Sequence, residues 1–250
     1  MNNRTFGPSL RLSATLLLVG QLLYVAITLL HAGGEANDHH AIFAGYAASG
    51  IWTAVHVGQF ACMVVLLAGL FALSFALDVQ TGMAHWASRF GAATTVVALA
   101  LYGGVLAVDG VALKQAVDAW ASAPAAEKAA RFATAEAIRW LEWGMRSYQN
   151  FALGLAVLLF AAAVARTASI PRPIAVPMGL SGLTYLAQGW VDGSAGFTET
   201  VTLAIVLAEV LNAVWMIWLV VVAWRMRDAS PRRLADAGGG RPDAIYTPSR

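Results

Sequence analysis

Four charged side chains stand at the entrance to an apolar run, in the segment AEAIRWLEWGMRSYQN at residues 135–150. They are Glu136, Arg139, Glu142 and Arg146, and the polar Asn150 already lies at the start of the run, before FALGLAVLLFAAAVA. Residues three or four apart share a face of a helix, so Glu142 is placed to contact both Arg139 and Arg146. The spacing predicts carboxylate–guanidinium pairs that neutralise one another before the helix enters an apolar medium.

Two interpretations of this segment stay open. In the first, the charges form a ladder at a membrane interface, beside an aromatic belt of Trp140, Trp143 and Tyr148. In the second, the charges line a polar pocket at one face of a helix bundle. The second interpretation depends on which other polar residues reach the same place.

Four further polar residues are expected on the same side of the bundle: His56, Asp109, Glu209 and Asn212. Glu209 is the most informative, because it lies about ten residues inside an apolar stretch. An ionised carboxylate at such a depth costs at least about 2.5 kcal/mol, so we expect it to be protonated, paired with arginine, or facing a wet cavity. A hydrogen bond that joins two helices is the competing structural explanation.

Histidine and carboxylate together suit zinc, copper or iron, and four histidines are expected near one end of the bundle: His31, His39, His40 and His56. No HxxxH or HExxH spacing places two of them on one helix face, so we predict no metal site and no cofactor. Cys62 is the only cysteine, which excludes an internal disulfide. Phosphate-loop, GxSxG and GxGxxG motifs are absent. The net charge of +2 gives no sign of nucleic-acid binding.

The elements that must position these residues are membrane-spanning helices. The chain is 59% hydrophobic and 12% charged, whereas a soluble domain carries about 25% charged residues. A helix needs about 20 mostly apolar residues to cross a bilayer. Runs of that length predict an all-α fold, a six-transmembrane-helix bundle formed by residues 1–227, with spans at about 12–32, 51–77, 90–110, 140–165, 174–192 and 200–224.

The longest polar insertion separates the third and fourth spans, from Val111 to Ile138. A helix is expected to end near Ser122, and another to begin at Pro124, a residue favoured in a first helical turn. The second helix is expected to continue unbroken to Ala165 and to project from the outer face.

Arginine and lysine predict the orientation, because positive charge near span ends is retained in the cytoplasm. With both termini inside, the inner side holds Arg4, Arg11, Arg89, Arg166, Arg172 and the basic tail after Trp224. We therefore expect a multi-pass protein of a bacterial inner (plasma) membrane with cytoplasmic N- and C-termini. Residues 228–250 are expected to be a disordered cytoplasmic tail that touches anionic lipid headgroups.

Three apolar segments carry a family resemblance: LLLVGQLLYVAITLL in the first span, MGLSGLTYL in the fifth and LAEVLNAVWMIWLVV in the sixth. They resemble the corresponding helices of an uncharacterised bacterial family of multi-pass membrane proteins, known as a domain of unknown function. In that family an acidic residue followed by a tryptophan recurs in the last helix, here Glu209 and Trp215. Up to about Arg227, the resemblance implies a six-helix integral membrane protein and implies no activity.

Three functional hypotheses follow from the residues. In the favoured one, an outward-facing pocket between the second, third, fourth and sixth spans binds or transports a small amphipathic or ionisable molecule. Arg139 or Arg146 would hold an anionic group, Glu142 would orient them, and Glu209 would be a deep proton-linked site. Alternatively, the protein is a membrane enzyme in which His56 and either Glu142 or Glu209 act as base and acid on a lipid-soluble substrate. In the third, it is a structural or assembly protein, for which a homo-oligomer is expected.

Overall fold

The computed structural model describes residues 3–33, 37–77 and 81–226, and in these ranges every regular element is a helix. The elements are α1 (Asn3–Thr28), α2 (His39–Ala48), α3 (Trp52–Leu77), α4 (Gly82–Ala107), η1 (Val108–Leu113), α5 (Lys114–Ala121), α6 (Lys128–Arg166), η2 (Arg172–Ile174), α7 (Ala175–Ala195) and α8 (Glu199–Arg225). The predicted all-α fold is confirmed. The tail at residues 228–250 lies outside the described residues.

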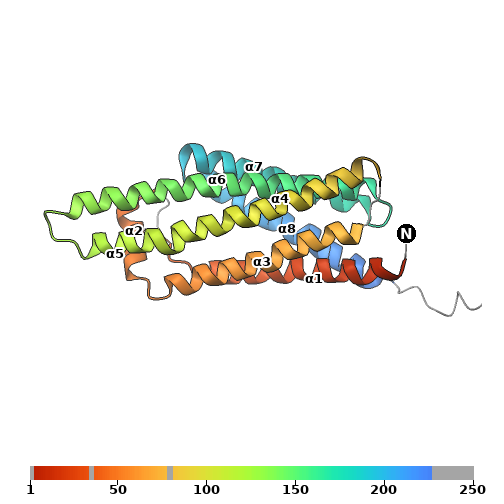
Figure 1. Cartoon of the computed structure of the whole chain (residues 1–250), viewed down its shortest axis with the longest axis horizontal. Coiled ribbons are helices and arrows are strands. Elements are labelled where there is room, and N and C mark those ends of the chain that lie inside the picture. The colour runs from red at the N-terminus through yellow and green to blue at the C-terminus, as the bar shows by residue number, and fades with distance from the viewer. Residues whose placement is uncertain (1–2, 34–36, 78–80, 227–250) are drawn as a thin grey trace, which may run out of the picture.

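The long helices form one elongated bundle (Figure 1). Helix α1 packs along α3, α6 packs against both α4 and α7, and α7 packs on α8, which also contacts α1. Apolar side chains from all six of these helices form one core, which includes Leu10, Leu67, Ala98, Phe160, Met178 and Trp215. The bundle therefore closes on itself, with the last long helix beside the first.

Glycines bring two pairs of helices into backbone contact. A Cβ atom on Gly20 of α1 would lie 2.5 Å from the backbone nitrogen of Leu66 in α3. A Cβ on Gly154 of α6 would lie 2.7 Å from the carbonyl oxygen of Gly182 in α7. Such close approach needs small residues, which are common where helices pack in membranes. The pairs α1–α3 and α6–α7 are thus the tightest contacts in the bundle.

A π-helical turn joins α4 to α5. Element η1 spans Val108–Leu113, and the three elements form one continuous helix from Gly82 to Ala121. Such turns are rare and often mark functional sites. After a short turn, α6 begins at Lys128 and runs unbroken to Arg166, a length of about 58 Å at 1.5 Å per residue. Helix α6 is the helix that was predicted to begin at Pro124 and to continue to Ala165. It begins a few residues later and is unbroken, as predicted.

One end of the bundle carries a small additional layer, which we call the cap: α2, α5 and residues 128–138 of α6 (Figure 1). Its apolar side chains form a second core, separate from that of the bundle, made by Ile42, Phe43, Tyr46, Trp52, Leu113, Val117 and Ala135. The cap places the start of α3 and the end of α1 under a folded cover, and it thereby closes that end of the bundle.

Five helices are long and apolar enough to cross a membrane within the described ranges: Phe6–Thr28, Trp52–Leu77, Gly82–Ala121, Lys128–Arg166 and Glu199–Arg225. Helix α7 is the one long helix of the bundle outside this group. Its sequence AVPMGLSGLTYLAQGWVDGSA contains serine, threonine, glutamine and aspartate among its apolar residues, and these polar groups lower its hydropathy.

Candidate ligand pocket

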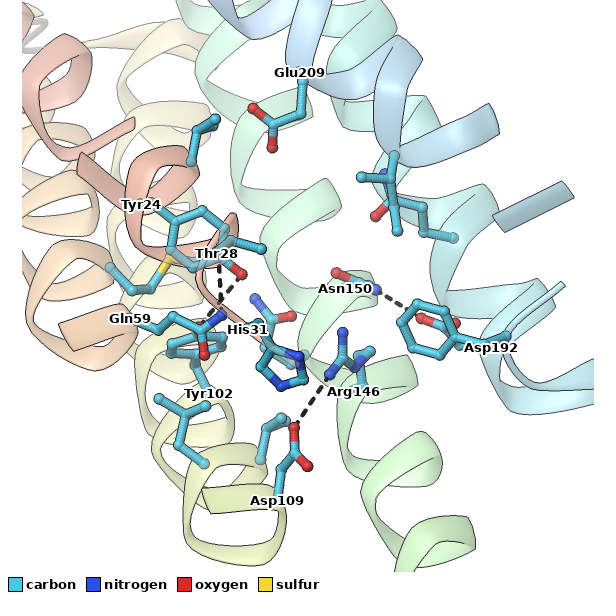
Figure 2. A pocket seen from close by; sticks show the side chains of 18 of the residues that line it. Tyr24, Thr28, His31, Gln59, Tyr102, Asp109, Arg146, Asn150, Asp192 and Glu209 are labelled. Carbon is cyan, nitrogen blue, oxygen red and sulfur yellow. Dashed lines mark hydrogen bonds and ion pairs between the residues drawn. The ribbon is translucent and has the colours of Figure 1, made fainter. Parts of the chain in front are cut away.

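A cavity of about 480 Å³ lies inside the bundle beneath the cap. Its wall is drawn from α1, α2, α3, α4, η1, α6, α7 and α8, which is more than the four predicted spans. Figure 2 shows Glu209 and Asp109 at opposite ends of the labelled side chains, with Tyr24, Gln59 and Tyr102 to one side and Arg146, Asn150 and Asp192 to the other. Apolar side chains such as Met63, Leu66 and Leu153 complete the wall.

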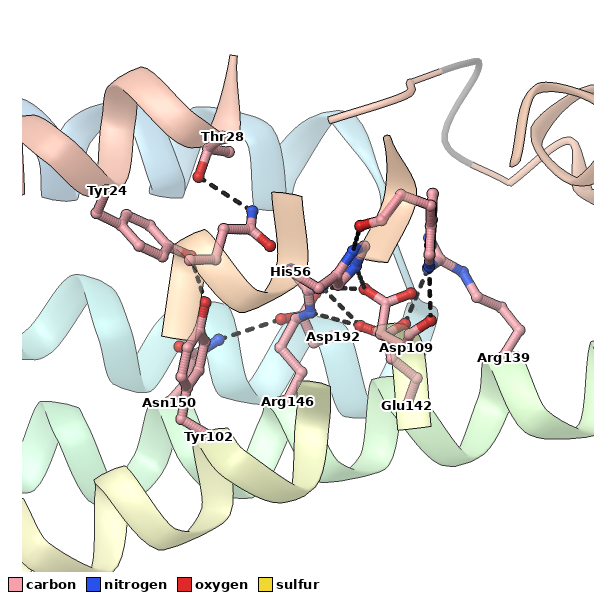
Figure 3. A network of polar contacts seen from close by, with 12 residues as sticks. Tyr24, Thr28, His56, Tyr102, Asp109, Arg139, Glu142, Arg146, Asn150 and Asp192 are labelled. Carbon is pink, nitrogen blue, oxygen red and sulfur yellow. Dashed lines mark hydrogen bonds and ion pairs between the residues drawn. The ribbon is translucent and has the colours of Figure 1, made fainter. Parts of the chain in front are cut away.

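Glu142 binds both arginines of the predicted charge ladder. Its Oε2 accepts a hydrogen bond from Nη1 of Arg139 at 3.0 Å, and its Oε1 accepts one from Nε of Arg146 at 2.7 Å. Nη2 of Arg146 lies 2.6 Å from the same Oε1. Glu142 is fully buried and lies behind the cavity wall, to which Arg139 and Arg146 belong. The predicted contacts within the ladder are confirmed, and Figure 3 shows Glu142 beside both arginines.

Asp109 and His56 form a buried pair next to this group. Asp109 lies in the π-helical turn, and its Oδ2 is 3.2 Å from Nε2 of His56 and 3.7 Å from Nη2 of Arg146. His56 comes from α3, and its Nδ1 lies 2.8 Å from the carbonyl oxygen of Trp52. His56 supports the wall from behind, whereas Asp109 lines the cavity. The carboxylate beside His56 is therefore Asp109, while Glu142 and Glu209 bind other partners.

Asp192 reaches the cavity from the end of α7. Its Oδ2 accepts a hydrogen bond from Nδ2 of Asn150 at 3.2 Å, while its Oδ1 is buried without a partner among the described residues. One turn earlier in α6, Ser147 donates to the carbonyl oxygen of Gly189 at 2.6 Å. These bonds fix α7 against α6, and Oδ1 of Asp192 stays buried at the cavity wall.

Glu209 lines the far end of the cavity. It accepts a hydrogen bond from Nε2 of Gln21 in α1. This agrees with both interpretations of Glu209, a cavity-facing carboxylate and a hydrogen bond that joins two helices, and not with an arginine pair. Asn212, one turn further along α8, lies outside the cavity wall. It donates to the hydroxyl of Tyr185 at 2.7 Å and accepts from Nε1 of Trp215 at 3.0 Å. Asn212 therefore orients a tyrosine of the wall, which is a correction to its expected place as a lining residue.

Glu136 also lies elsewhere than expected. It is in the cap, outside the cavity wall, and its Oε1 is 2.9 Å from Nδ1 of His39. His40 stacks on Phe132 with ring centroids 4.1 Å apart. Two turns of helix separate Glu136 from Glu142, which carries Glu136 past the end of the cavity. The structure thus separates His39 and His40 from His31 and His56, which the sequence had grouped together.

Burial shifts two titratable groups that lie outside the long helices of the bundle. It lowers the pKa of His31 to about 4, because the charged imidazolium loses its hydration. It raises the pKa of Tyr46 to about 12, because the phenolate would be desolvated. His31 and Tyr46 are therefore both neutral at neutral pH, in the part of the wall that the cap covers.

Several wall residues were missed in the sequence: Gln21, Tyr24, Tyr102, Tyr185 and Gln188. Tyr24 and Tyr102 join α1 to α4 through their hydroxyls at 3.4 Å. A glutamine inside an apolar helix is costly unless it has a partner, so Gln21 and Gln188 carried a usable signal. The tyrosines carried no such signal, because membrane helices place tyrosine at interfaces as often as in a core.

Comparisons of the chain with models of protein families, with curated proteins and with solved structures find no match. The family resemblance inferred from apolar segments stays a prediction.

Proposed function

We propose that the chain is an integral membrane protein that crosses the bilayer six times, through α1, α3, α4, α6, α7 and α8. The two ends of the bundle support an even number of crossings. Arg11 near the start of α1 donates to the carbonyl oxygens of Ala223 at 3.2 Å and Met226 at 2.6 Å, at the end of α8. The start of α1 and the end of α8 therefore lie on the same side of the membrane, which requires an even number of crossings. Five helices would give an odd number, so α7 is needed as the sixth crossing.

The outside of the bundle supports a lipid environment. Large apolar side chains are exposed along it, among them Leu22, Val57, Phe75, Val96, Leu155, Leu183, Leu203, Val210 and Ile217. Exposed aromatic residues gather toward its two ends: Trp86, Phe90 and Trp224 at one, Trp140, Tyr148 and Trp190 at the other. In water this surface would drive association, whereas in a bilayer it is the expected boundary with lipid.

The charge distribution supports an orientation with the cap outside and both termini in the cytoplasm of a bacterial inner membrane. Cysteine labelling tests this orientation, because Cys62 is buried and contributes little background. In intact cells, Ala126→Cys, in the exposed turn between α5 and α6, is expected to react with a membrane-impermeant thiol reagent. Ala168→Cys, in the exposed loop at the opposite end, is expected to react only after lysis. The reverse pattern would overturn the orientation.

The pocket is proposed to bind a small amphipathic molecule, for transport or sensing. The observation that carries this function is the cavity of about 480 Å³ within the bundle, which lies in the size range of small-molecule sites. Its wall combines apolar side chains with polar groups from several helices. Polar groups are costly inside a membrane bundle, and they commonly mark a path or site for a ligand.

The polar group of the ligand is expected to donate hydrogen bonds, as a hydroxyl or amine does. Both arginines of the wall are bound by Glu142, so they are poor anchors for an anion. By contrast, Oδ1 of Asp192 is a buried acceptor without a partner in the described structure, and the carboxylate of Glu209 accepts a hydrogen bond from the amide of Gln21. Among the described residues, the wall therefore offers carboxylate acceptors at Asp192 and Glu209, beside one unpaired donor, Nε of Arg139.

Native mass spectrometry of the protein released from nanodiscs tests this function. The wild-type chain is expected to retain a small molecule, and Asp192→Asn and Glu209→Gln are expected to lose it. Trp190→Ala is a matched control on α7, because Trp190 is two residues from Asp192 and 70% exposed on the outside. A wild-type chain that carries nothing, or a mass retained equally in all variants, would overturn the proposal.

A further inference from the structure

His56 and Asp109 present two buried lone pairs to each other. A carbonyl oxygen only accepts hydrogen bonds, so the 2.8 Å contact with the Trp52 carbonyl requires Nδ1 of His56 to carry the proton. In the neutral imidazole, Nε2 then carries a lone pair, and it lies 3.2 Å from Oδ2 of Asp109. Nε2 has no hydrogen-bond partner among the described residues, and neither has Oδ1 of Asp109. The side chains are only 3% and 2% exposed, so neither atom faces bulk solvent.

We infer that His56, Asp109 and His31 form a site for one divalent transition-metal ion, of the zinc or iron(II) class. One ligand atom from each residue lies within 4.8 Å of the other two. Two imidazoles and one carboxylate are a common ligand set for zinc and for iron(II), with positions left open for water or substrate.

The distance between the two buried ligands fits such an ion. Metal–nitrogen and metal–oxygen bonds of about 2.0–2.2 Å place neighbouring ligand atoms about 3.0–3.5 Å apart. The 3.2 Å from His56 to Asp109 lies within that range. The His31 ring is 5.0 Å from the His56 ring, centroid to centroid, so a modest rotation brings its nitrogen to the ion. The hydrogen bond from Nδ1 to a backbone carbonyl is also the usual support of a metal-bound histidine.

The π-helical turn is what carries Asp109 to His56. A Cβ atom on Gly110, the next residue, would lie 2.8 Å from Cβ of His56. The turn therefore approaches α3 as closely as a glycine allows, and it directs the carboxylate toward the imidazole. Since π-helical turns often mark functional sites, this local distortion has a purpose in the inferred site.

The charges around the pocket also favour a divalent cation. The side chains in and directly behind the wall include two arginines, Arg139 and Arg146, and four carboxylates. The carboxylates are those of Asp109, Glu142, Asp192 and Glu209, so the net charge is −2 when all six groups are ionised. A divalent ion at Asp109 offsets part of that negative charge, since Glu209 lies at the opposite end of the cavity (Figure 2). Arg146 does not replace the ion, because its Nη2 is 3.7 Å from Asp109 and its short contacts are with Glu142.

The site opens into the pocket, since His31 and Asp109 both belong to the wall. An open coordination position would face the cavity. The three residues come from different parts of the chain: His31 from the segment just after α1, His56 from α3 and Asp109 from η1. This arrangement explains why spacing within single helices gave no sign of a metal site.

Zinc titration of the tag-free, chelator-treated protein in detergent tests the inference. We expect one zinc per chain, measured by competition with a chromophoric chelator. His56→Ala and Asp109→Asn are each expected to weaken zinc binding by more than roughly 100-fold, beyond what the loss of an outer-shell partner causes. Matched controls are His40→Ala and Asp118→Asn, a histidine and an aspartate of the cap, which are expected to bind zinc as the wild type does.

His31→Ala provides a second variant, because His31 is partly exposed and its loss is less damaging to the core. It is expected to keep the helix content and to lose at least roughly tenfold in zinc affinity. Less than one zinc per wild-type chain, or unchanged affinity in folded Asp109→Asn and His31→Ala, would overturn the inference. In that event the pair is an imidazolium–carboxylate ion pair. The titration uses the ion alone, so its result is independent of the organic ligand proposed above.

Discussion

Removing Glu142 is expected to destabilise the bundle more than any other single charge substitution in α6. Glu142→Ala leaves Arg139 and Arg146 without the carboxylate that both contact at 2.6–3.0 Å. Taking one partner from a buried ion pair costs about 3–5 kcal/mol, because the remaining charge stays buried and uncompensated. Asp109, at 3.7 Å from Arg146, offsets part of this loss. We therefore expect the free energy of unfolding to fall by about 3–5 kcal/mol.

A pair with the same spacing on the same helix provides the control. Glu127 and Arg131 are also four residues apart and lie 3.2 Å from each other, but each side chain is more than half exposed. Exposed pairs of this kind contribute about 0.3–0.5 kcal/mol. Glu127→Ala should therefore be almost neutral, so the difference between the two variants isolates the effect of burial.

The assay is equilibrium unfolding in mixed micelles with a denaturing detergent, followed by helix content. Glu142→Gln is a third variant, which keeps the shape of the side chain and removes its charge. We expect it to lose most of the stability that Glu142→Ala loses. If Glu142→Ala comes within about 1 kcal/mol of Glu127→Ala, the buried ladder is not an important source of stability and the reasoning is refuted.

Three further substitutions test other contacts by the same unfolding assay. Gly182→Val is expected to cost about 1–3 kcal/mol by forcing α7 away from Gly154, whereas Gly144→Val, with open space around it, should cost less. Arg11→Gln should lose about 1.5–3 kcal/mol and speed hydrogen exchange in the last turn of α8. The pKa of Tyr46 is about 12 in the folded chain and about 10 in the unfolded chain. The free energy of unfolding should therefore fall as the pH rises from 10 to 12, by up to about 3 kcal/mol. Tyr46→Phe should reduce the slope of the free energy of unfolding against pH in this range. An unchanged slope would contradict the assignment of this fall to Tyr46.

The contacts that were predictable from the sequence are those within one helix. Arg139, Glu142 and Arg146 are three and four residues apart, and helix geometry alone brings them together. The long helices were predictable for a similar reason, since an apolar run satisfies its backbone hydrogen bonds only within itself. The ends of α3, α7 and α8 differ from the predicted spans by at most three residues, whereas α1 begins nine residues and α4 eight residues before the predicted start.

The contacts between helices were not predictable. His56 meets Asp109 across 53 positions of sequence because a π-helical turn displaces the carboxylate, and no pattern in AVDGVALK signals that turn. Asn150 meets Asp192 because glycines let α6 and α7 approach closely. Such packing details decide which face of each helix turns inward. The sequence of an apolar helix does not reveal that face, because its faces differ too little in polarity.

The two glycine-packed pairs limit how the pocket can open to admit a ligand. Separating α1 from α3, or α6 from α7, would break backbone contacts along their whole length. The contacts of α1 with α8 and α4, which we call seams, differ from these backbone contacts because side chains make them. Gln21 bonds to Glu209 of α8, and Tyr24 bonds to Tyr102 of α4. A hydrogen bond between side chains contributes only about 0.5–1.5 kcal/mol, so these seams are the cheaper place to open. We therefore expect a ligand to enter between α1 and α8, because an opening there leaves the contact of His56 in α3 with Asp109 intact.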